Sequence, residues 1–136
     1  SSTSRGLGDV YKRQLFDQKE RVDLVEAAVS HLNNVTVRRF QGLSVTFVRE
    51  QEAHVVLRGV RSLTDIESEF TMTLANRMLD SEIETVFLMA DAQYSHISSS
   101  LLKQITPLAN DIALGKFVPP AVVKALREKL AKKINP

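Results

Sequence analysis

Three consecutive serines, Ser98–Ser100, stand directly before an amphipathic run in the segment YSHISSSLLKQI, residues 94–105. Serine is a favoured N-cap residue, and the apolar residues that follow recur at helical spacing, so the simplest interpretation is a helix start. The exposed N–H groups of such a start, with hydroxyls beside them, can also bind phosphate. Taken alone, this spacing favours the cap over the phosphate site.

The segment RGVR, residues 58–61, is a second candidate anion site because it places two guanidinium groups around a glycine. Each guanidinium offers a planar fork of donors that matches paired phosphate oxygens. Gly59 allows a ligand to approach the backbone closely. Arg61 at a helix start is electrostatically unfavourable unless an anion is present. A solvated turn has the same sequence, so both interpretations stay open.

The helix expected over residues 62–79 has a mixed polar stripe. At 100° per residue, its members lie within about 60° of one another; they are Asp65, Glu69, Met72 and Asn76. The opposite side is apolar. A carboxylate, thioether and amide stripe fits a groove for a partly apolar ligand, but it also fits a solvent-facing surface. The spacing does not decide between them.

Other catalytic chemistry has little support. The three histidines, His31, His54 and His96, do not have the spacing of metal ligands, and the chain has no cysteine. No Ser-His-Asp arrangement and no pair of catalytic carboxylates can be argued from the positions. The sequence therefore offers phosphate-binding groups and no nucleophile.

Helices and strands alternate after residue 15. The periodicity predicts strands over 35–40, 54–59 and 84–90, and helices over 16–32, 42–51, 62–79, from Ser98, and from Pro119 or Pro120. This alternation indicates an α/β fold with a parallel sheet and helices on both faces. Such sheets bind ligands beyond the carboxyl ends of their strands. The serines and RGVR both follow strands, which favours a binding role for them.

The first fourteen residues, SSTSRGLGDVYKRQ, differ from the rest of the chain. They are rich in serine and glycine and resemble translated adapter sequence, so we expect residues 1–14 to be a non-native, disordered lead-in and residues 15–136 a partial domain. The lead-in holds three basic residues and one acidic residue. Without it, the totals of 18 basic and 16 acidic residues become equal. The net charge of +2 therefore does not support nucleic-acid binding.

The composition also bounds the location. No apolar run approaches the roughly 18 residues that span a bilayer, and no signal peptide is present. The lack of cysteine suits a reducing compartment. We therefore expect a soluble cytoplasmic protein that binds neither membrane nor nucleic acid.

Three segments resemble one family, the bacterial phosphopantetheine adenylyltransferases: VVLRGVRSLTDIESEF, VFLMADAQYSHISSSLLKQI and FVPPAVVKAL. The resemblance runs in one register from Phe16 to the final helix. It implies a Rossmann-like nucleotidyltransferase fold and transfer of adenylyl from ATP to 4′-phosphopantetheine, which gives dephospho-coenzyme A and pyrophosphate. It further implies Mg²⁺ bound through the ATP phosphates, a homo-hexamer, and coenzyme A as a feedback ligand.

The resemblance also assigns site residues. The implied ATP-binding residues are Gly59, Val60, Arg61, Glu69, Tyr94, Ser95, His96, Ile97, Ser98, Ser99 and Ser100. The implied substrate-binding residues are Ser44, Arg58, Met72 and Asn76. On this interpretation the serines form a phosphate cradle that also caps its helix.

Several family features are missing. The first strand, its Thr-x-Gly-His motif and the following helix and strand belong upstream of residue 15, so we expect a fragment that lacks the first β-α-β part. That histidine stabilises the transition state, so we expect no catalytic residue and no measurable turnover here. Lys12 matches a substrate-binding lysine by chance, and Ser68 and Thr71 replace an aromatic residue and glutamine. A catalytically inactive fragment that keeps only nucleotide-binding or subunit-contact surfaces remains the alternative.

Overall fold

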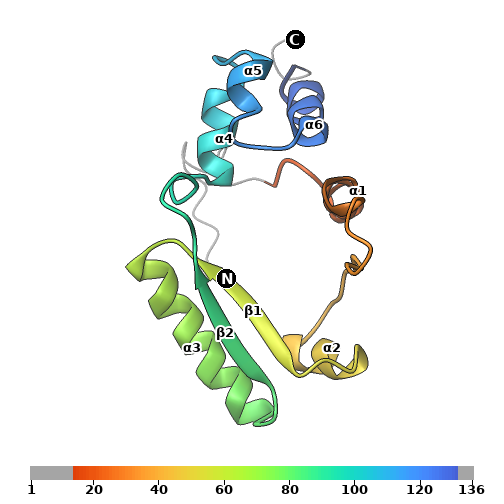
Figure 1. Cartoon of the computed structure of the whole chain (residues 1–136), viewed down its shortest axis with the longest axis vertical. Coiled ribbons are helices and arrows are strands. Elements are labelled where there is room, and N and C mark those ends of the chain that lie inside the picture. Colours follow the sequence, from red (N-terminus) through yellow and green to blue (C-terminus); the bar gives the residue numbers. More distant parts are fainter. Residues whose placement is uncertain (1–13, 132–136) are drawn as a thin grey trace. The chain divides into compact units, whose positions relative to one another are not determined.

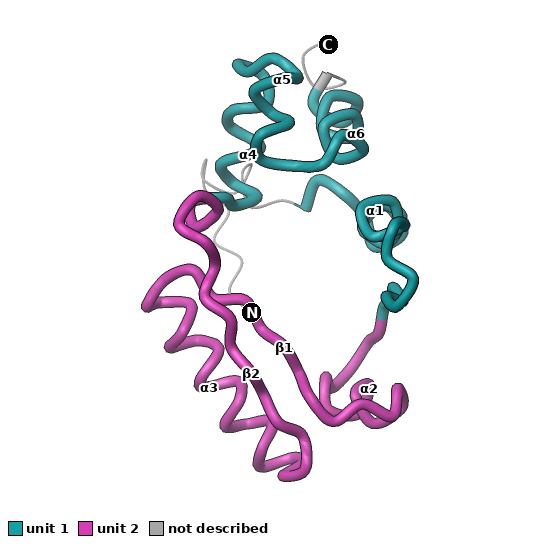
Figure 2. The backbone as a smooth tube through the Cα atoms, viewed as in Figure 1, with its two compact units in different colours: residues 1–39, 97–136 teal, residues 40–96 magenta. Residues whose placement is uncertain are grey.

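The structure of the protein is a computed structural model that describes residues 14–131 (Figure 1). The chain divides into two compact units, which Figure 2 shows in different colours. One unit contains residues 40–96, and the other combines residues 1–39 with residues 97–136. Within the described range, no helix is long and apolar enough to cross a membrane.

The unit of residues 40–96 is built on a β-α-β element. Strand β1 (Val55–Val60) is followed by helix α3 (Leu63–Leu79) and strand β2 (Glu84–Met89), and the shorter helix α2 (Ser44–Glu50) precedes them. The strands pair in parallel, with Val55 opposite Glu84 and Val60 opposite Met89. Both strands therefore end at the same edge of the sheet. The predicted parallel sheet is confirmed.

The two faces of this sheet differ in burial. Side chains alternate between the faces along each strand, and the face that contains Val60 and Arg58 is turned toward α3, because Arg58 bonds to Glu69 of that helix. The opposite face is apolar and open: Val55, Leu57, Val86 and Leu88 are between 46% and 61% exposed. The expectation of helices on both faces is therefore met on one face only in this unit.

Helix α3 leaves its apolar stripe uncovered as well. None of its residues is buried, and Leu63, Phe70 and Leu74 are 82%, 55% and 49% exposed. The reason is that the sheet has only two strands, so the helix packs against it through a narrow strip. The apolar pattern therefore predicted the helix correctly, but the apolar face of that helix is not buried.

The strand predicted over residues 35–40 is wrong. These residues are an extended connection without ladder hydrogen bonds, and β1 and β2 are the only strands in the described chain. A strand requires a neighbour that accepts and donates its backbone hydrogen bonds. The alternating pattern of Val35, Val37 and the residues around them indicates extended chain, but it does not supply that neighbour.

The other unit is helical. It contains α1 (Gln18–Val29), α4 (Ser99–Ile105), α5 (Asp111–Leu114) and α6 (Pro120–Ala131). The predicted helix starts at Ser98 and Pro120 are confirmed, whereas α5 was not predicted, because a single turn of helix has too few residues to show a period. The lead-in of residues 1–14, which we expect to be disordered, lies outside the described residues except for Gln14.

Buried residues and two ion pairs hold the helical unit together. Leu114, Val123 and Leu126 are at most 7% exposed and form its small core. Lys129 of α6 bonds to Glu20 of α1 at 2.8 Å. Arg127, also on α6, pairs with Asp111 at 2.8 Å and donates to backbone carbonyls at the end of α4 and before α5. Helix α6 is therefore the common partner of the other helices.

Arg49 has a similar tying role in the β-α-β unit. Its guanidinium, at the end of α2, bonds to both oxygens of Asp80 and, at 2.6 Å, to Glu82. Asp80 is the C-cap residue of α3, and Glu82 lies in the turn that leads into β2. One side chain thus connects α2 with the connection between α3 and β2.

We expect the contribution of the Arg49–Asp80 pair to stability to depend on pH. The hydrogen bond from Arg49 is the largest cause that holds the pKa of the Asp80 carboxyl below its ordinary value of 3.8. A carboxyl with a lowered folded-state pKa stabilises the fold above its unfolded pKa, and that contribution is lost as pH falls through the folded pKa. Arg49→Ala should lower the melting temperature by roughly 2 °C at neutral pH, and the difference should close below about pH 4.

Calorimetric melting between about pH 2 and pH 7 provides the measurement. Arg38→Ala is the matched control, because Arg38 is exposed and makes no ion pair within residues 14–131. An equal loss in that control, or a difference that persists at the acid end, would contradict this role of Arg49.

Candidate functional site

Arg58 and Glu69, both predicted site residues, bond to each other. Arg58 Nε lies 2.8 Å from Glu69 Oε2, and Arg58 Nη2 lies 2.6 Å from Glu69 Oε1. Arg58 comes from the carboxyl half of β1 and Glu69 from the second turn of α3. The guanidinium lowers the pKa of the Glu69 carboxyl, and Glu69 in turn raises the pKa of Arg58. Both groups therefore stay charged at neutral pH.

Arg61 has an acidic neighbour of its own. Its backbone N–H donates to Asp65 Oδ2 at 3.1 Å, and its Nε lies 3.5 Å from the same oxygen. Ser62 caps α3 by accepting a hydrogen bond from the backbone N–H of Asp65. A carboxylate of the chain thus supplies the anion that the sequence argument required at this helix start. The unfavourable position of Arg61 by itself no longer indicates a ligand.

The residues beside these arginines offer backbone rather than side chains. Val60 is 3% exposed, so its side chain belongs to the core of its unit. Gly59 lies in β1 with no atom within 4 Å of the place that a Cβ would take. The carbonyl of Val60 accepts a hydrogen bond from the N–H of Ala90 at 2.7 Å, so the backbone of Gly59 is the part of this strand end that a ligand can approach.

The predicted pantetheine-binding residues share the β-α-β unit with Arg58. Met72 and Asn76 lie one and two turns beyond Glu69 on α3, and Met72 is 57% exposed while Asn76 is half-buried. Ser44 is the first residue of α2 and is exposed. The mixed polar stripe predicted on α3 therefore exists, and one of its two carboxylates, that of Glu69, faces the sheet.

The loop after β2 is held by its own hydrogen bonds. The N–H of Tyr94 donates to the carbonyl of Asp91 at 2.9 Å, and the hydroxyl of Ser95 donates to the carbonyl of Ala92 at 3.0 Å. Tyr94 is 51% exposed. His96 ends the β-α-β unit, and Ile97 begins the helical part.

The three serines have different surroundings. Ser98 is the N-cap of α4, and its hydroxyl accepts from the N–H of Leu101 at 3.1 Å, so the cap predicted from the sequence is confirmed. Ser99 and Ser100 instead line a hollow of about 590 Å³ within the helical unit. Of the three serines, only Ser98 uses its hydroxyl to cap the start of the helix.

The hollow beside Ser99 and Ser100 combines positive charge with apolar walls. Arg21 of α1 and Lys103 of α4 line it together with the serines. The walls are formed by Leu15, Phe16, Leu24, Val25, Leu102, Val122 and Leu126, and Gln14 completes the lining. Sequence reasoning missed Arg21 and Lys103. Lys103 follows Ser99 by four residues and so shares its helix face, which is the signal that could have found it.

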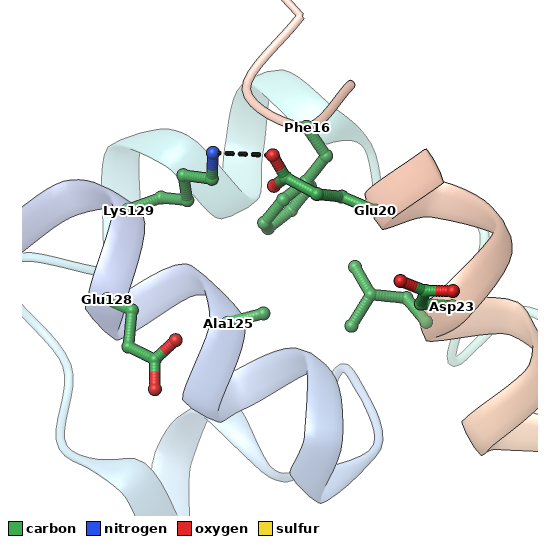
Figure 3. A pocket seen from close by; sticks show the side chains of 7 residues that line it. Phe16, Glu20, Asp23, Ala125, Glu128 and Lys129 are labelled. Carbon is green, nitrogen blue, oxygen red and sulfur yellow. Dashed lines mark hydrogen bonds and ion pairs between the residues drawn. The ribbon is translucent and has the colours of Figure 1, made fainter. Parts of the chain in front are cut away.

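A second hollow, of about 380 Å³, lies between α1 and α6 and contains no predicted site residue (Figure 3). The ion pair of Glu20 and Lys129 crosses it, and Asp23 and Glu128 lie at its sides. Its one cation is already neutralised by Glu20, so this hollow does not suit an anionic ligand.

Two features decide what the described residues can do. They contain no group of three or more histidines or acidic residues that could hold a metal ion. The predicted residues up to His96 belong to the β-α-β unit, whereas Ile97–Ser100 belong to the helical one. Both units nevertheless present donors of the kind that bind phosphate oxygens. These donors are the guanidinium of Arg58 in the β-α-β unit, and hydroxyl, guanidinium and ammonium groups around the hollow of the helical unit.

Comparison with known proteins agrees with this chemistry. Residues 6–105 match the family described as cytidylyltransferase-like. The chain is 56% identical over 128 residues to a phosphopantetheine adenylyltransferase of Rhodopirellula baltica, an alignment that covers 93% of this chain and 72% of the relative. Relatives of the same name from Clostridium perfringens and Caulobacter vibrioides are each 44% identical, over 91% of this chain and 74% and 77% of their own lengths.

The cap role of Ser98 makes a prediction about stability. Ser98→Ala leaves the N–H of Leu101 without its partner, and loss of an N-cap residue costs about 1 kcal/mol. Ser99→Ala is the matched control, because Ser99 is already inside the helix, where alanine is the better helix former. Urea denaturation should show a lower midpoint for Ser98→Ala only. Equal midpoints for the two variants would show that Ser98 does not stabilise α4.

Proposed function

The chain belongs to the phosphopantetheine adenylyltransferase family, and we propose that the protein transfers the adenylyl group of ATP to 4′-phosphopantetheine. The products are dephospho-coenzyme A and pyrophosphate, in a step of coenzyme A synthesis. The observation that carries the proposal is 56% identity over 93% of the chain to a relative of that name. The comparisons favour this enzyme over the alternative of an inactive binding fragment.

The proposed reaction needs no covalent enzyme intermediate. A phosphate oxygen of 4′-phosphopantetheine attacks the α-phosphorus of ATP in line, and the bond from that phosphorus to the bridging oxygen of the leaving pyrophosphate breaks. Because the substrate is the nucleophile, positioning and stabilisation of the charge on the phosphates supply the rate. A chain with phosphate-binding donors and no nucleophile of its own suits this reaction.

We assign the two substrates to different groups of the predicted site residues. We assign the phosphate of 4′-phosphopantetheine to Arg58, with Ser44, Met72 and Asn76 toward its pantetheine arm. We assign the ATP phosphates to the hydroxyls of Ser99 and Ser100, supported by the cations that line the same hollow. A guanidinium that keeps one donor edge open and a hollow with hydroxyls and positive charge both support these assignments.

The remaining expectations belong to the same proposal. Mg²⁺ would arrive bound to the phosphate oxygens and waters of ATP, so it requires no cage of protein ligands, and we assign no side chain to it. Assembly as a homo-hexamer, feedback by coenzyme A, and a cytoplasmic location follow from the family resemblance and stay predictions.

Pyrophosphate release with both substrates tests the reaction. The sequence contains no Thr-x-Gly-His motif, and removal of one transition-state donor typically lowers turnover roughly 10²- to 10³-fold. We therefore expect turnover by the given residues to be lower, by at least this factor, than turnover by a chain that carries the motif. Replacement of residues 1–14 by the N-terminal segment of the Rhodopirellula baltica relative should give turnover. Robust release without that segment would contradict the assigned role of the motif, and no release with it would contradict the proposed reaction.

Substrate binding tests the assignment of Arg58. Arg58→Ala should weaken binding of 4′-phosphopantetheine roughly 10- to 100-fold, the usual cost of one hydrogen bond to a charged group, while pantetheine without the phosphate should bind equally to both chains. Arg77→Ala is the matched control, because Arg77 also bonds to an acidic residue, Glu84, but at the other end of the strands. Isothermal titration calorimetry gives both affinities. Equal losses in the two variants would contradict the assignment.

A further inference from the structure

The pairing of Arg58 with Glu69 leaves one side of the guanidinium open. Glu69 takes the edge formed by Nε and Nη2, through two hydrogen bonds of 2.8 Å and 2.6 Å. An arginine has five N–H donors, so two on Nη1 and one on Nη2 remain. Within residues 14–131, Nη1 of Arg58 contacts no acceptor. The open edge is itself a fork that matches two oxygens of a phosphate.

The exposure of the two side chains is unequal. Glu69 is 20% exposed and Arg58 is 52% exposed. The carboxylate therefore lies on the inner side of the pair, between strand and helix, and the guanidinium lies on the outer side. An incoming anion meets Arg58 before it meets Glu69.

Both oxygens of Glu69 already accept a hydrogen bond from Arg58. The resemblance assigned Glu69 to ATP, but a carboxylate repels the ATP phosphates and can accept only from the ribose hydroxyls or the adenine amino group. Its contacts in the structure are those of a residue that orients another residue.

The physical benefit of such orientation is entropic. A free arginine side chain has many rotamers, and fixing one rotamer-rich side chain on binding reduces affinity by about tenfold. An arginine that is already held by a carboxylate has lost that freedom before the ligand arrives. Exposed ion pairs contribute little to folding stability, so a role in orientation explains the bidentate geometry better than a role in stability.

We propose that Glu69 is a positioning residue, which holds the inner edge of Arg58 so that its outer edge is preset for the phosphate of 4′-phosphopantetheine. This inference rests on the proposed function, because that function supplies the phosphate. It assigns Glu69 to the acceptor substrate through Arg58, and not to direct contact with ATP.

The test must separate orientation from charge. Glu69→Gln would remove a negative charge near the phosphate and so relieve repulsion at the same time. Glu69→Asp keeps the charge but shortens the side chain by one methylene, which prevents both bonds from forming in the present geometry. Glu67→Asp is the matched control, because Glu67 lies on the same helix, is exposed, and makes no ion pair within the described chain.

Isothermal titration calorimetry on the full chain gives the first readout. Glu69→Asp should weaken 4′-phosphopantetheine about tenfold, leave ATP within about twofold, and have no effect when Arg58 is already alanine. Glu67→Asp should bind both ligands normally. A loss confined to ATP would show that Glu69 contacts the nucleotide, and a loss that persists in the Arg58→Ala background would show that Glu69 does not act through Arg58. Either result overturns the inference, as does normal binding by Glu69→Asp.

Nuclear magnetic resonance of the arginine Nε–H groups gives a second readout that needs no substrate. With inorganic phosphate as the probe, the Arg58 signal should shift at roughly tenfold lower phosphate concentration in the unsubstituted chain than in Glu69→Asp. The Arg77 signal serves as the internal reference. A normal phosphate response in a chain that does not bind 4′-phosphopantetheine would overturn the proposed function and leave the positioning role standing. No shift of Arg58 with phosphate, or the same shift in both chains, overturns the positioning role itself.

Discussion

The parallel pairing of β1 with β2 is the constraint on which the β-α-β unit depends. Parallel strands require a crossover connection, and α3 is that connection, so its polar stripe is placed along the sheet. The same pairing brings the carboxyl ends of both strands to one edge of the sheet. Arg58 lies near that edge on β1, and the loop that contains Asp91 follows β2 there. With only two strands, however, the sheet buries few side chains. Val60 of β1 and Ile83, directly before β2, are buried, while the second face of the sheet stays apolar and open.

Because the core is small, charged side chains supply further connections between the helices and strands. The guanidinium of Arg49 joins α2 to the end of α3, Arg127 joins α6 to α5, and Arg58 joins β1 to α3. Such exposed pairs add little net stability because water competes for both partners. The Arg49–Asp80 and Arg58–Glu69 pairs are nevertheless specific in geometry, since each is a bidentate fork that fixes the direction of the side chain. In this protein, ion pairs define where elements and side chains point more than they increase the free energy of unfolding.

Much of the fold could be predicted from the sequence. The helical periods and the capping residues gave the helix starts at Ser62, Ser98 and Pro120, since capping is a local interaction between near neighbours. The apolar runs before Gly59 and Ala90 gave both strands. The extended segment 35–40 could not be judged in the same way, because pairing depends on a neighbour far away in the sequence. For the same reason, the apolar stripe of α3 did not reveal that it stays exposed.

The sequence by itself determined which chemical groups stand at the strand ends and helix starts, and from these groups it predicted phosphate binding and the family. Only the tertiary structure decided what each group does. It made Asp65 the partner of Arg61, gave Ser98 the cap, and placed Arg21 of α1 in one hollow with Lys103 of α4. It also turned Glu69 toward Arg58. The physical reason is that a hydrogen bond or an ion pair is settled by the direction and distance of two side chains. Residue types fix neither when the partners come from different elements.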